Sequence, residues 1–164
     1  MHRRFLFLLA LCLLASIPAR AQSVDIFGGY SYLRFEGTPA GNYNGWELAG
    51  QYKVRKWLGG IVDVSGDYGS PTGVTSSVRT YMVGPQVSFP WRITPFAHVI
   101  GGLGQFTQGN VDKIGLGYGY GAGIDMKIAP RISWRILQGD EIETRFFGKT
   151  QGNLRFSSGI VFHF

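Results

Sequence analysis

The stretch IGLGYGYGAGID (Ile114–Asp125) decides the fold of this chain. Glycine occupies every second position from 115 to 123, and between the glycines stand Leu116, Tyr118, Tyr120 and Ala122. Side chains alternate between the two faces of a β-strand, so this pattern is typical of a strand with one bare face and one apolar face. A dinucleotide-binding loop is disfavoured, because it needs the spacing G-x-G-x-x-G and a helix directly after it. A disordered linker would not interleave Leu, Tyr and Ile so regularly.

The same period of two recurs along the chain after residue 21, and no window carries a convincing helical stripe. In WELAGQYKV (46–54), the clearest example, one face is polar or small and the other is formed by Trp46, Leu48, Gly50, Tyr52 and Val54. We therefore predict about eight strands from this pattern. Their expected ranges are Val24–Phe35, Trp46–Val54, Leu58–Tyr68, Val78–Phe89, Phe96–Phe106, Leu116–Lys127, Ile132–Arg145 and Asn153–Phe164.

The connections between these strands alternate in length. Long polar segments at 36–45, 69–77, 107–115 and 147–152 alternate with short ones at 55–57, 90–95 and 129–131. Long loops at one end and short turns at the other are typical of outer-membrane β-barrels, whose short turns lie on the periplasmic side. An even number of strands would place both termini of the barrel domain on that side.

The first residues are organised like a secretory signal peptide. Two arginines precede the apolar run 5–17, and Ala19-Arg20-Ala21 supplies small residues where signal peptidase reads them. We predict a signal peptide over 1–21 and a barrel domain over 22–164. The single cysteine, Cys12, lies in the signal, so the mature chain has no disulfide or thiol chemistry. Removing the signal leaves 13 of the 16 basic residues against 10 acidic ones, too mild an excess for nucleic-acid binding.

A period of two does not by itself say which face points inward. In a soluble barrel the apolar face lines the interior, whereas in a membrane barrel it faces lipid and the lumen is polar. Export through a signal peptide favours the membrane. So do aromatic residues near the strand ends of the apolar face, as at a lipid–water interface: Tyr32, Trp46, Tyr68, Tyr118 and Trp134. A soluble secreted ligand-binding barrel remains an alternative.

Four segments carry a resemblance to a known group of proteins. They are GGYSYLRF (28–35), WLGGIVDVSGDYG (57–69), TPFAHVIGGLG (94–104) and the terminal GIVFHF (159–164). Together they resemble the small eight-stranded outer-membrane barrels of the outer-membrane protein A-like and opacity-porin group. The resemblance implies an all-β fold, an eight-stranded antiparallel up-and-down transmembrane barrel, in a monomer of the outer membrane. It also implies that Phe162 and Phe164 form the signal that the barrel assembly machinery recognises.

The inward face of such a barrel is expected to carry paired charges, because burying a charged side chain unpaired is costly. We predict a salt-bridge network across the lumen formed by Glu47, Asp63, Asp125, Arg135 and Arg155. An eight-stranded barrel is only just wide enough for its side chains. A bare strip on one strand would make room for long side chains, with Arg135 as the first expected occupant; the strip is formed by Gly117, Gly119, Gly121 and Gly123.

Two further arginines fall on the lipid-facing parity. Arg34 and Arg79 lie near the expected outer rim. Arginine pairs bidentately with phosphate, so these residues are candidates for contact with lipopolysaccharide. The alternative is that their side chains simply extend to water.

Two positions break the regular pattern. Pro85 falls in mid-strand, where it cannot donate to the hydrogen-bond ladder, and we expect a bulge there. In the seventh strand the parity slips after Ile136, so that Gln138 and Asp140 fall on the lipid side. A bulge near Gly139, or an earlier exit of the strand from the bilayer, would reconcile these polar residues with a membrane barrel.

The sequence carries no recognisable catalytic or metal-binding motif. The mature histidines, His98 and His163, lack the neighbouring ligands of a metal site. The serines 133, 157 and 158 have no histidine two residues away to act as a base. We therefore predict no enzymatic activity, cofactor or metal, and a structural or surface-interaction role. A small low-conductance pore and a lipid-modifying enzyme are the alternatives.

Overall fold

The computed structural model describes residues 23–36, 40–71, 73–146 and 149–164, so the predicted signal peptide lies outside the described part. Its strands are β1 (Val24–Phe35), β2 (Gly41–Lys53), β3 (Leu58–Gly69), β4 (Ser76–Ser88), β5 (Ile93–Gln108), β6 (Val111–Ala129), β7 (Ile132–Phe146) and β8 (Lys149–His163). Each strand pairs antiparallel with the next, and β1 pairs with β8, which closes the barrel. No helix among the described residues is long and apolar enough to cross a membrane.

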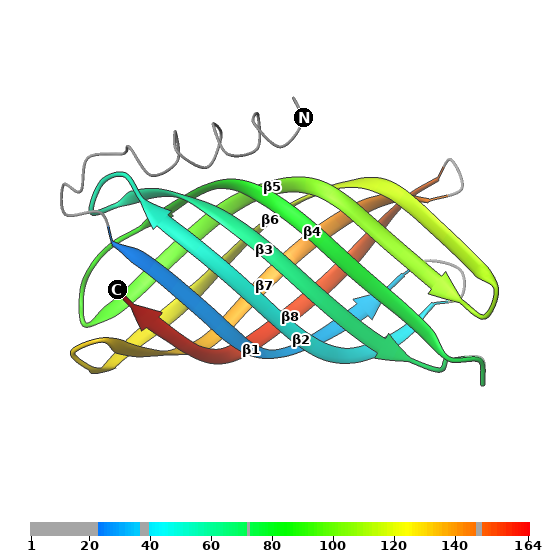
Figure 1. The fold of residues 1–164 in the computed structure, drawn as a ribbon, viewed down its shortest axis with the longest axis horizontal. Helices are drawn as coiled ribbons and strands as arrows, with labels where there is room; N and C mark the ends of the chain where they lie inside the picture. The colour runs from blue at the N-terminus through cyan, green and yellow to red at the C-terminus, as the bar shows by residue number, and fades with distance from the viewer. Residues whose placement is uncertain (1–22, 37–39, 72, 147–148) are drawn as a thin grey trace, which may run out of the picture.

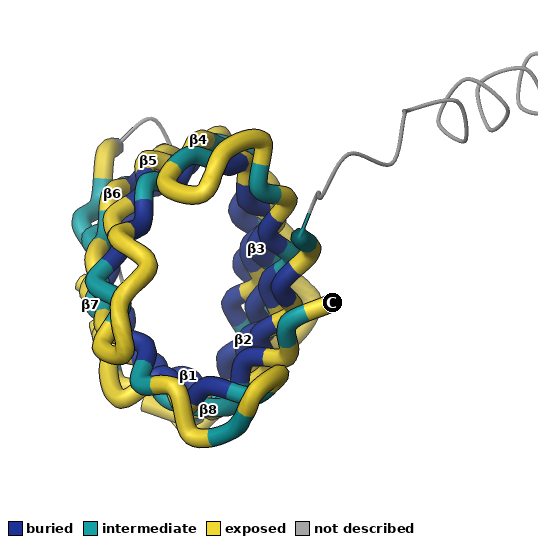
Figure 2. The backbone as a smooth tube through the Cα atoms, turned by 90° about the vertical axis from the view of Figure 1, so that its left-hand side faces the viewer, coloured by how far each residue is buried: buried dark blue, intermediate teal, exposed yellow. Residues whose placement is uncertain are grey.

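The barrel has two distinct ends. At the one we call the terminal end, β1 begins, β8 finishes, and the connections are 54–57, 89–92 and 130–131 (Figure 1). At the opposite, loop end, the connections are 36–40, 70–75, 109–110 and 147–148. Figure 2 looks along the barrel from the terminal end and shows the strands as a closed ring.

The loops at the loop end are shorter than the sequence predicts. Strand β2 begins at Gly41 and β6 at Val111, so half of the polar segment 36–45 and most of 107–115 is strand. The turn between β5 and β6 needs only 109–110, where Gly109 has a φ of 55°, a conformation that glycine adopts easily. The prediction of long loops was wrong here. Both faces of a strand reach water at the loop end, so the strand can continue its hydrogen bonding through polar residues without an apolar face.

The two faces of the strands have the predicted parity. On β2, Trp46 and Leu48 are 45% and 50% exposed on the outside, whereas Glu47 and Ala49 on the inside are 1% and 3% exposed. The same alternation runs along the other strands, with large apolar side chains outside and charged residues such as Asp63, Arg135 and Arg155 buried inside. The barrel is therefore apolar outside and largely polar within.

One of the two expected irregularities is present. The register of β7 against β8 shifts between Arg135 and Gln138, so that Ile136 and Leu137 both point outward. This bulge returns the following polar residues to the lumen, as predicted, although it lies before Gly139. The register of β4 shows no shift at Pro85, so the bulge predicted there was wrong. The ladder to β5 is instead interrupted at Gly84 and Pro85, which accommodates the missing N–H.

Apolar side chains share the lumen with the polar ones. Among the described residues, one buried cluster draws on every strand except β6: Phe27, Ala49, Ile61, Met82, Ile100, Ile142 and Val161. A second cluster lies toward the loop end and contains Leu33, Phe35, Tyr43, Val78 and Phe106. Within it the rings of Phe35 and Phe106 stack with their centroids 5.4 Å apart, and Tyr43 meets Phe35 edge-on at 5.9 Å. An aromatic layer therefore fills the lumen on the loop side.

Candidate functional site

The charged residues of the lumen converge on Arg155 of β8. Its guanidinium donates to both carboxylate oxygens of Asp63 at 2.8 and 3.1 Å. It also donates to Asp140 through Nε at 2.9 Å and through a terminal nitrogen at 2.7 Å. The carboxylate of Glu47 lies 3.5 Å from Nε. All four side chains are completely buried, so these contacts form in the absence of bulk water.

Gln138 connects this hub to a second ion pair. Its amide nitrogen donates to Glu47 at 2.9 Å and to Asp140 at 2.7 Å, and its amide oxygen accepts from Arg135 at 2.6 Å. Arg135 in turn binds Asp125 with two hydrogen bonds of 2.8 and 3.1 Å. One hydrogen-bonded network, which we call the lumen network, therefore runs from Asp63 to Asp125.

The guanidinium of Arg135 is also held by two aromatic rings. It lies 4.2 Å from the ring centroid of Phe27 and 4.3 Å from that of Phe96. A cation between two aromatic faces is stabilised most where water is absent, and Arg135 is 3% exposed. This explains how one arginine with a single carboxylate partner is accommodated inside the barrel.

The lumen network brings together all five of the residues expected in it: Glu47, Asp63, Asp125, Arg135 and Arg155. Sequence reasoning missed Gln138 and Asp140, because a strict alternation places them on the lipid side beyond Ile136. It also missed His98, whose Nε2 lies 3.0 Å from Asp140. The sequence signal for the bulge is the pair of consecutive apolar residues Ile136 and Leu137. Polar residues alternate after this pair, and the bulge turns them inward.

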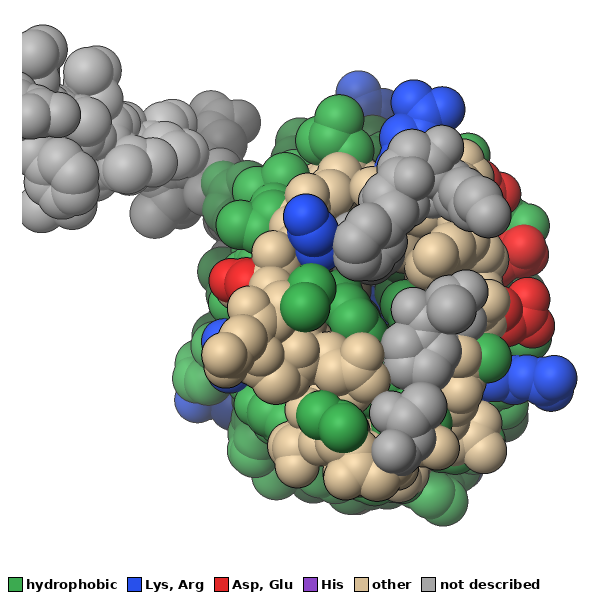
Figure 3. All heavy atoms as spheres, turned by 90° about the vertical axis from the view of Figure 1, so that its right-hand side faces the viewer, with side chains coloured by type: hydrophobic (Ala, Val, Ile, Leu, Met, Phe, Trp, Pro, Cys, Tyr) green, Lys and Arg blue, Asp and Glu red, His purple; other side chains and the backbone are tan. Residues whose placement is uncertain are grey.

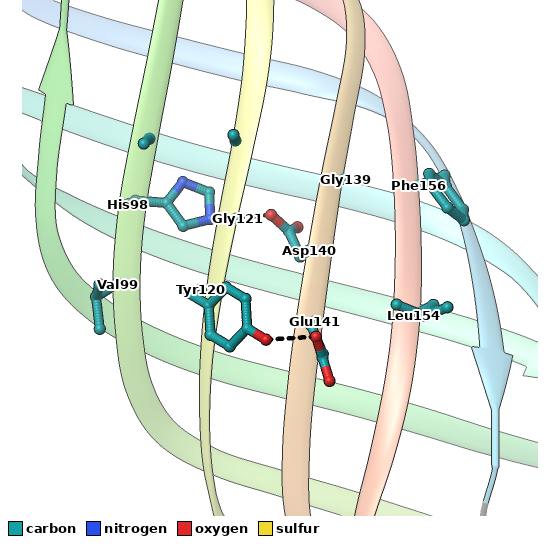
Figure 4. A pocket seen from close by; sticks show the side chains of 11 residues that line it. His98, Val99, Tyr120, Gly121, Gly139, Asp140, Glu141, Leu154 and Phe156 are labelled. Carbon is teal, nitrogen blue, oxygen red and sulfur yellow. Dashed lines mark hydrogen bonds and ion pairs between the residues drawn. The ribbon is translucent and has the colours of Figure 1, made fainter.

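The glycine strip on β6 makes room for contacts that cross this strand. A Cβ on Gly121 would lie 1.9 Å from the Oδ1 atom of Asp140, and a Cβ on Gly123 would lie 2.4 Å from the ring of Phe96. Figure 4 shows His98 and Asp140 meeting across Gly121. The prediction that Arg135 occupies the space above the glycine strip was wrong. Phe96 takes the space at Gly123, and Arg135 packs against the ring of Phe96.

The outer wall at this point carries a shallow hollow of about 560 Å³. Small residues of neighbouring strands, including Ala97, Ala122 and Gly139, line it. On its loop side Tyr120 donates a hydrogen bond of 2.5 Å to Glu141 (Figure 4). The hydroxyl of Tyr118 binds Glu143 in the same way. Glu141 and Glu143 thus each have a tyrosine partner. Both lie in the half of β7 nearer the loop end, which is consistent with a position toward the outer rim of the barrel.

His98 and His163 lie in different parts of the lumen. His98 belongs to the lumen network, whereas His163 lies at the terminal end between Ser133 and Asp25. The sequence places no histidine two residues from Ser133, but the fold brings one to it from another strand. In the described part of the chain, no group of three or more His, Cys, Asp or Glu residues is arranged to hold a metal ion.

The rim residues singled out from the sequence do not form one site. The side chain of Arg34 is 65% exposed and lies 3.9 Å from Glu36. Arg79 is exposed near the loop-end start of β4, three strands away from Arg34 on β1. At the terminal end, Phe162 and Phe164 point outward and are 46% and 70% exposed.

The fold matches solved outer-membrane barrels at low sequence identity. Neisserial surface protein A matches with a TM-score of 0.71 and 11% identity, over 88% of this chain and 98% of that one. OprG from Pseudomonas aeruginosa gives 0.59 and 9%, over 87% and 95%. A major outer membrane protein from Thermus thermophilus gives 0.57 and 12%, over 88% and 100%. No protein-family model and no curated protein matches the sequence.

These likenesses concern the fold. Each matched chain is covered almost completely, so the whole barrel is shared rather than one hairpin of it. The chain has the fold of the small outer-membrane barrels, a closed barrel of eight antiparallel strands. The fold class and the resemblance predicted from its segments are confirmed.

Proposed function

We propose that this chain is an outer-membrane β-barrel protein with a sealed lumen and a structural or surface-interaction role. The observation that carries the proposal is the polarity of the wall, apolar outside and charged inside. Leu116, Val99 and Val83 are 73%, 60% and 57% exposed on the outer face. A continuous belt of such residues is far larger than the apolar patches of soluble proteins, and in a bilayer it faces lipid.

The alternative of a soluble secreted barrel is not supported by this polarity. A soluble ligand-binding barrel needs an apolar cavity and a polar outer surface. Here the lumen holds two ion pairs with buried arginines, and the outer belt ends in aromatics such as Trp46, Tyr118 and Trp134. Tyrosine and tryptophan favour the lipid–water interface, so the belt has the composition expected of a membrane wall.

The packing of the lumen favours a structural barrel over a pore. The side chains of Arg155, Asp63 and Asp140 are fully buried. Toward the loop end the stacked rings of Phe35 and Phe106 close the section above them. A conducting path would have to break buried ion pairs and displace an aromatic layer, both of which cost several kcal/mol.

The loop end is the proposed interaction surface. Seen from that side, the described surface is mostly uncharged polar side chains, backbone and apolar groups, with charged groups mainly toward the edge (Figure 3). Arg34 and Arg79 supply separate cations on the outer face, which suit phosphate groups of lipopolysaccharide. At the other end, the exposed rings of Phe162 and Phe164 suit recognition by the assembly machinery during biogenesis.

Fractionation and gel mobility with and without boiling test this proposal. A chain that stays in the outer membrane after carbonate extraction, and that migrates differently before and after boiling, would support a lipid-embedded barrel. A chain released as a soluble periplasmic protein would contradict it. In that case the apolar outer belt would need another covering, such as a second copy of the chain.

A further inference from the structure

A chain of three hydrogen-bonded side chains lies at the terminal end, outside the lumen network. Ser133 Oγ is 2.7 Å from His163 Nε2, and His163 Nδ1 is 2.8 Å from Asp25 Oδ1. Lys53 Nζ lies 2.5 Å from the other oxygen of the same aspartate. This order of serine, imidazole and carboxylate is the arrangement that activates a hydroxyl nucleophile in hydrolases, where it is recognised by geometry rather than by sequence order.

We propose that Ser133, His163 and Asp25 form an esterase-type site that opens at the terminal end of the barrel, and that it acts on carboxylic esters carrying an anionic group. The ion pair with Lys53 keeps Asp25 ionised, so the aspartate only accepts, and His163 Nδ1 carries the proton that it donates. His163 Nε2 is then left as the acceptor for the Ser133 hydroxyl. Ser133 and His163 would be the catalytic residues, while Asp25 and Lys53 position the imidazole.

Neighbouring strands bring these residues together. Asp25 and His163 are Cα partners across the β1–β8 seam. Ser133 is the partner of Val161 on β8, two residues before His163 and on the same inward face. On the other side Ser133 pairs with Lys127, next to a register shift between Lys127 and Ala129. Such irregularities re-aim side chains and are common beside active sites.

A hollow of about 280 Å³ gives the serine a place to meet a substrate. Ser133, His163 and Asp25 line it together with Lys53, Lys127, Thr94 and Trp91. Asp125 lines it as well, with its carboxylate paired to Arg135. Lys127 is the register partner of Ser133 and lines the same hollow, so its ammonium is the candidate group to stabilise the negative charge that develops on a carbonyl oxygen. Trp91 offers an apolar wall for the acyl group.

The charge around this opening selects the substrate class. The terminal-end connections carry Arg55, Lys56, Arg92 and Arg131 and no acidic residue. Positive groups around an opening raise the local concentration of anions and speed their association. An ester with a carboxylate or phosphate near the acyl group therefore fits the opening better than a neutral ester of the same size.

The reaction balances with water as the only co-reactant. Ser133 Oγ attacks the ester carbonyl carbon while His163 Nε2 takes the hydroxyl proton. The tetrahedral intermediate collapses, the ester C–O bond breaks, and His163 returns the proton to the leaving alcohol. Water, deprotonated by His163, then attacks the acyl carbon. The second tetrahedral intermediate collapses, the bond between that carbon and Ser133 Oγ breaks, and His163 returns the proton to Oγ, which releases a carboxylic acid and restores Ser133.

The test uses the full mature chain, folded in detergent and checked by its heat-dependent gel mobility. A fluorophosphonate probe reports an activated serine, and mass spectrometry locates the label. p-Nitrophenyl hemisuccinate and p-nitrophenyl butyrate compare an anionic with a neutral ester of similar size. Phosphatidylglycerol in mixed micelles distinguishes a lipid ester from a soluble one. The variants are Ser133→Ala, His163→Asn and, as a control on the adjacent strand, Ser158→Ala, whose hydroxyl binds the Arg135 carbonyl instead.

We expect the label on Ser133 and hydrolysis of the hemisuccinate several-fold faster than of the butyrate. Ser133→Ala and His163→Asn should fall to the rate without protein, and Ser158→Ala should match the wild type. His163→Asn retains a donor toward Asp25 but has no base. A heat-modifiable wild-type barrel without label or hydrolysis would overturn the esterase proposal. The three side chains would then only stabilise the contact between β1, β8 and β7, and the proposed membrane role would be unaffected. Loss of the mobility shift itself would instead count against the barrel proposal.

Discussion

Arg155 of β8 and Asp63 of β3 bind each other across the lumen with two hydrogen bonds, of 2.8 and 3.1 Å. The two strands are separated in the wall by β1 and β2. The pair therefore links parts of the barrel that the backbone ladder connects only through intervening strands. A bidentate arginine–carboxylate contact fixes the geometry of both partners, so it cross-braces the barrel as well as neutralising two buried charges.

Replacing the arginine should cost more stability than replacing the aspartate. Arg155→Met leaves Asp63, Glu47 and Asp140 without their shared cation, and breaking a buried pair in this way costs about 3–5 kcal/mol. Asp63→Asn leaves the contacts of Arg155 with Asp140 in place, so its loss should be smaller. Urea unfolding in detergent, followed by tryptophan fluorescence, measures both. Asp112→Asn, an exposed change at the loop end, is the control; a larger loss in Asp63→Asn than in Arg155→Met would contradict this view of the hub.

The glycine strip should tolerate a methyl group poorly where it is crossed by other side chains. In Gly121→Ala the new Cβ would lie 1.9 Å from Asp140 Oδ1, so Asp140 must move away from His98 or Arg155. Overpacking of this kind costs about 1–3 kcal/mol. Gly50→Ala on β2 is the matched control, since its Cβ would meet nothing within 4 Å. Equal unfolding midpoints for the two variants would mean that the strip is not needed for space.

The sequence predicts the barrel well because each strand must present one apolar face. That requirement produces a period of two in the hydrophobic residues, which can be recognised from the sequence alone. The sequence predicts Glu47 and Arg155 as lumen residues for the same reason. It does not predict the partners of Asp140, since a single bulge between Arg135 and Gln138 inverts the parity of everything after it. The slip of alternation after Ile136 indicates a bulge, but the contacts that Asp140 then makes depend on the register against neighbouring strands, which the alternation within one strand does not encode.

The triad at the terminal end escaped sequence reasoning for a related reason. Asp25 and His163 lie in the first and last strands, and only closure of the barrel brings β1 beside β8. A motif search looks for residues at fixed spacing, whereas His163 reaches Ser133 across a strand pair. The absence of a histidine near Ser133 in the sequence was therefore no guide to the absence of a base.

The lumen should not conduct ions. The stacked rings of Phe35 and Phe106 and the buried hub at Arg155 occupy the lumen, so we expect the wild-type chain in a planar bilayer to give no steady single-channel current. Gramicidin added to the same bilayer is the control for detection. A steady current whose size changes in Arg135→Ala would contradict the sealed lumen and support the alternative of a small pore.

Changes at Phe164 should separate recognition during assembly from stability of the finished barrel. The backbone of Phe164 donates to the Val24 carbonyl at 2.9 Å and accepts from the Val24 N–H at 3.4 Å, while its ring is 70% exposed. Phe164→Ala keeps both backbone bonds and loses only the ring. Deletion of Phe164 loses the bonds as well, each worth about 1 kcal/mol.

Both variants should therefore give less heat-modifiable barrel in cells, because both lack the ring offered to the assembly machinery. When refolded from urea into detergent, where no machinery is present, Phe164→Ala should fold as well as the wild type and only the deletion should lose yield. Leu154→Ala, another outward apolar change on β8, controls for lost hydrophobic surface. If Phe164→Ala reaches the wild-type yield in cells, the ring is not read during assembly, and the role of the last residue is confined to closing the seam between β1 and β8.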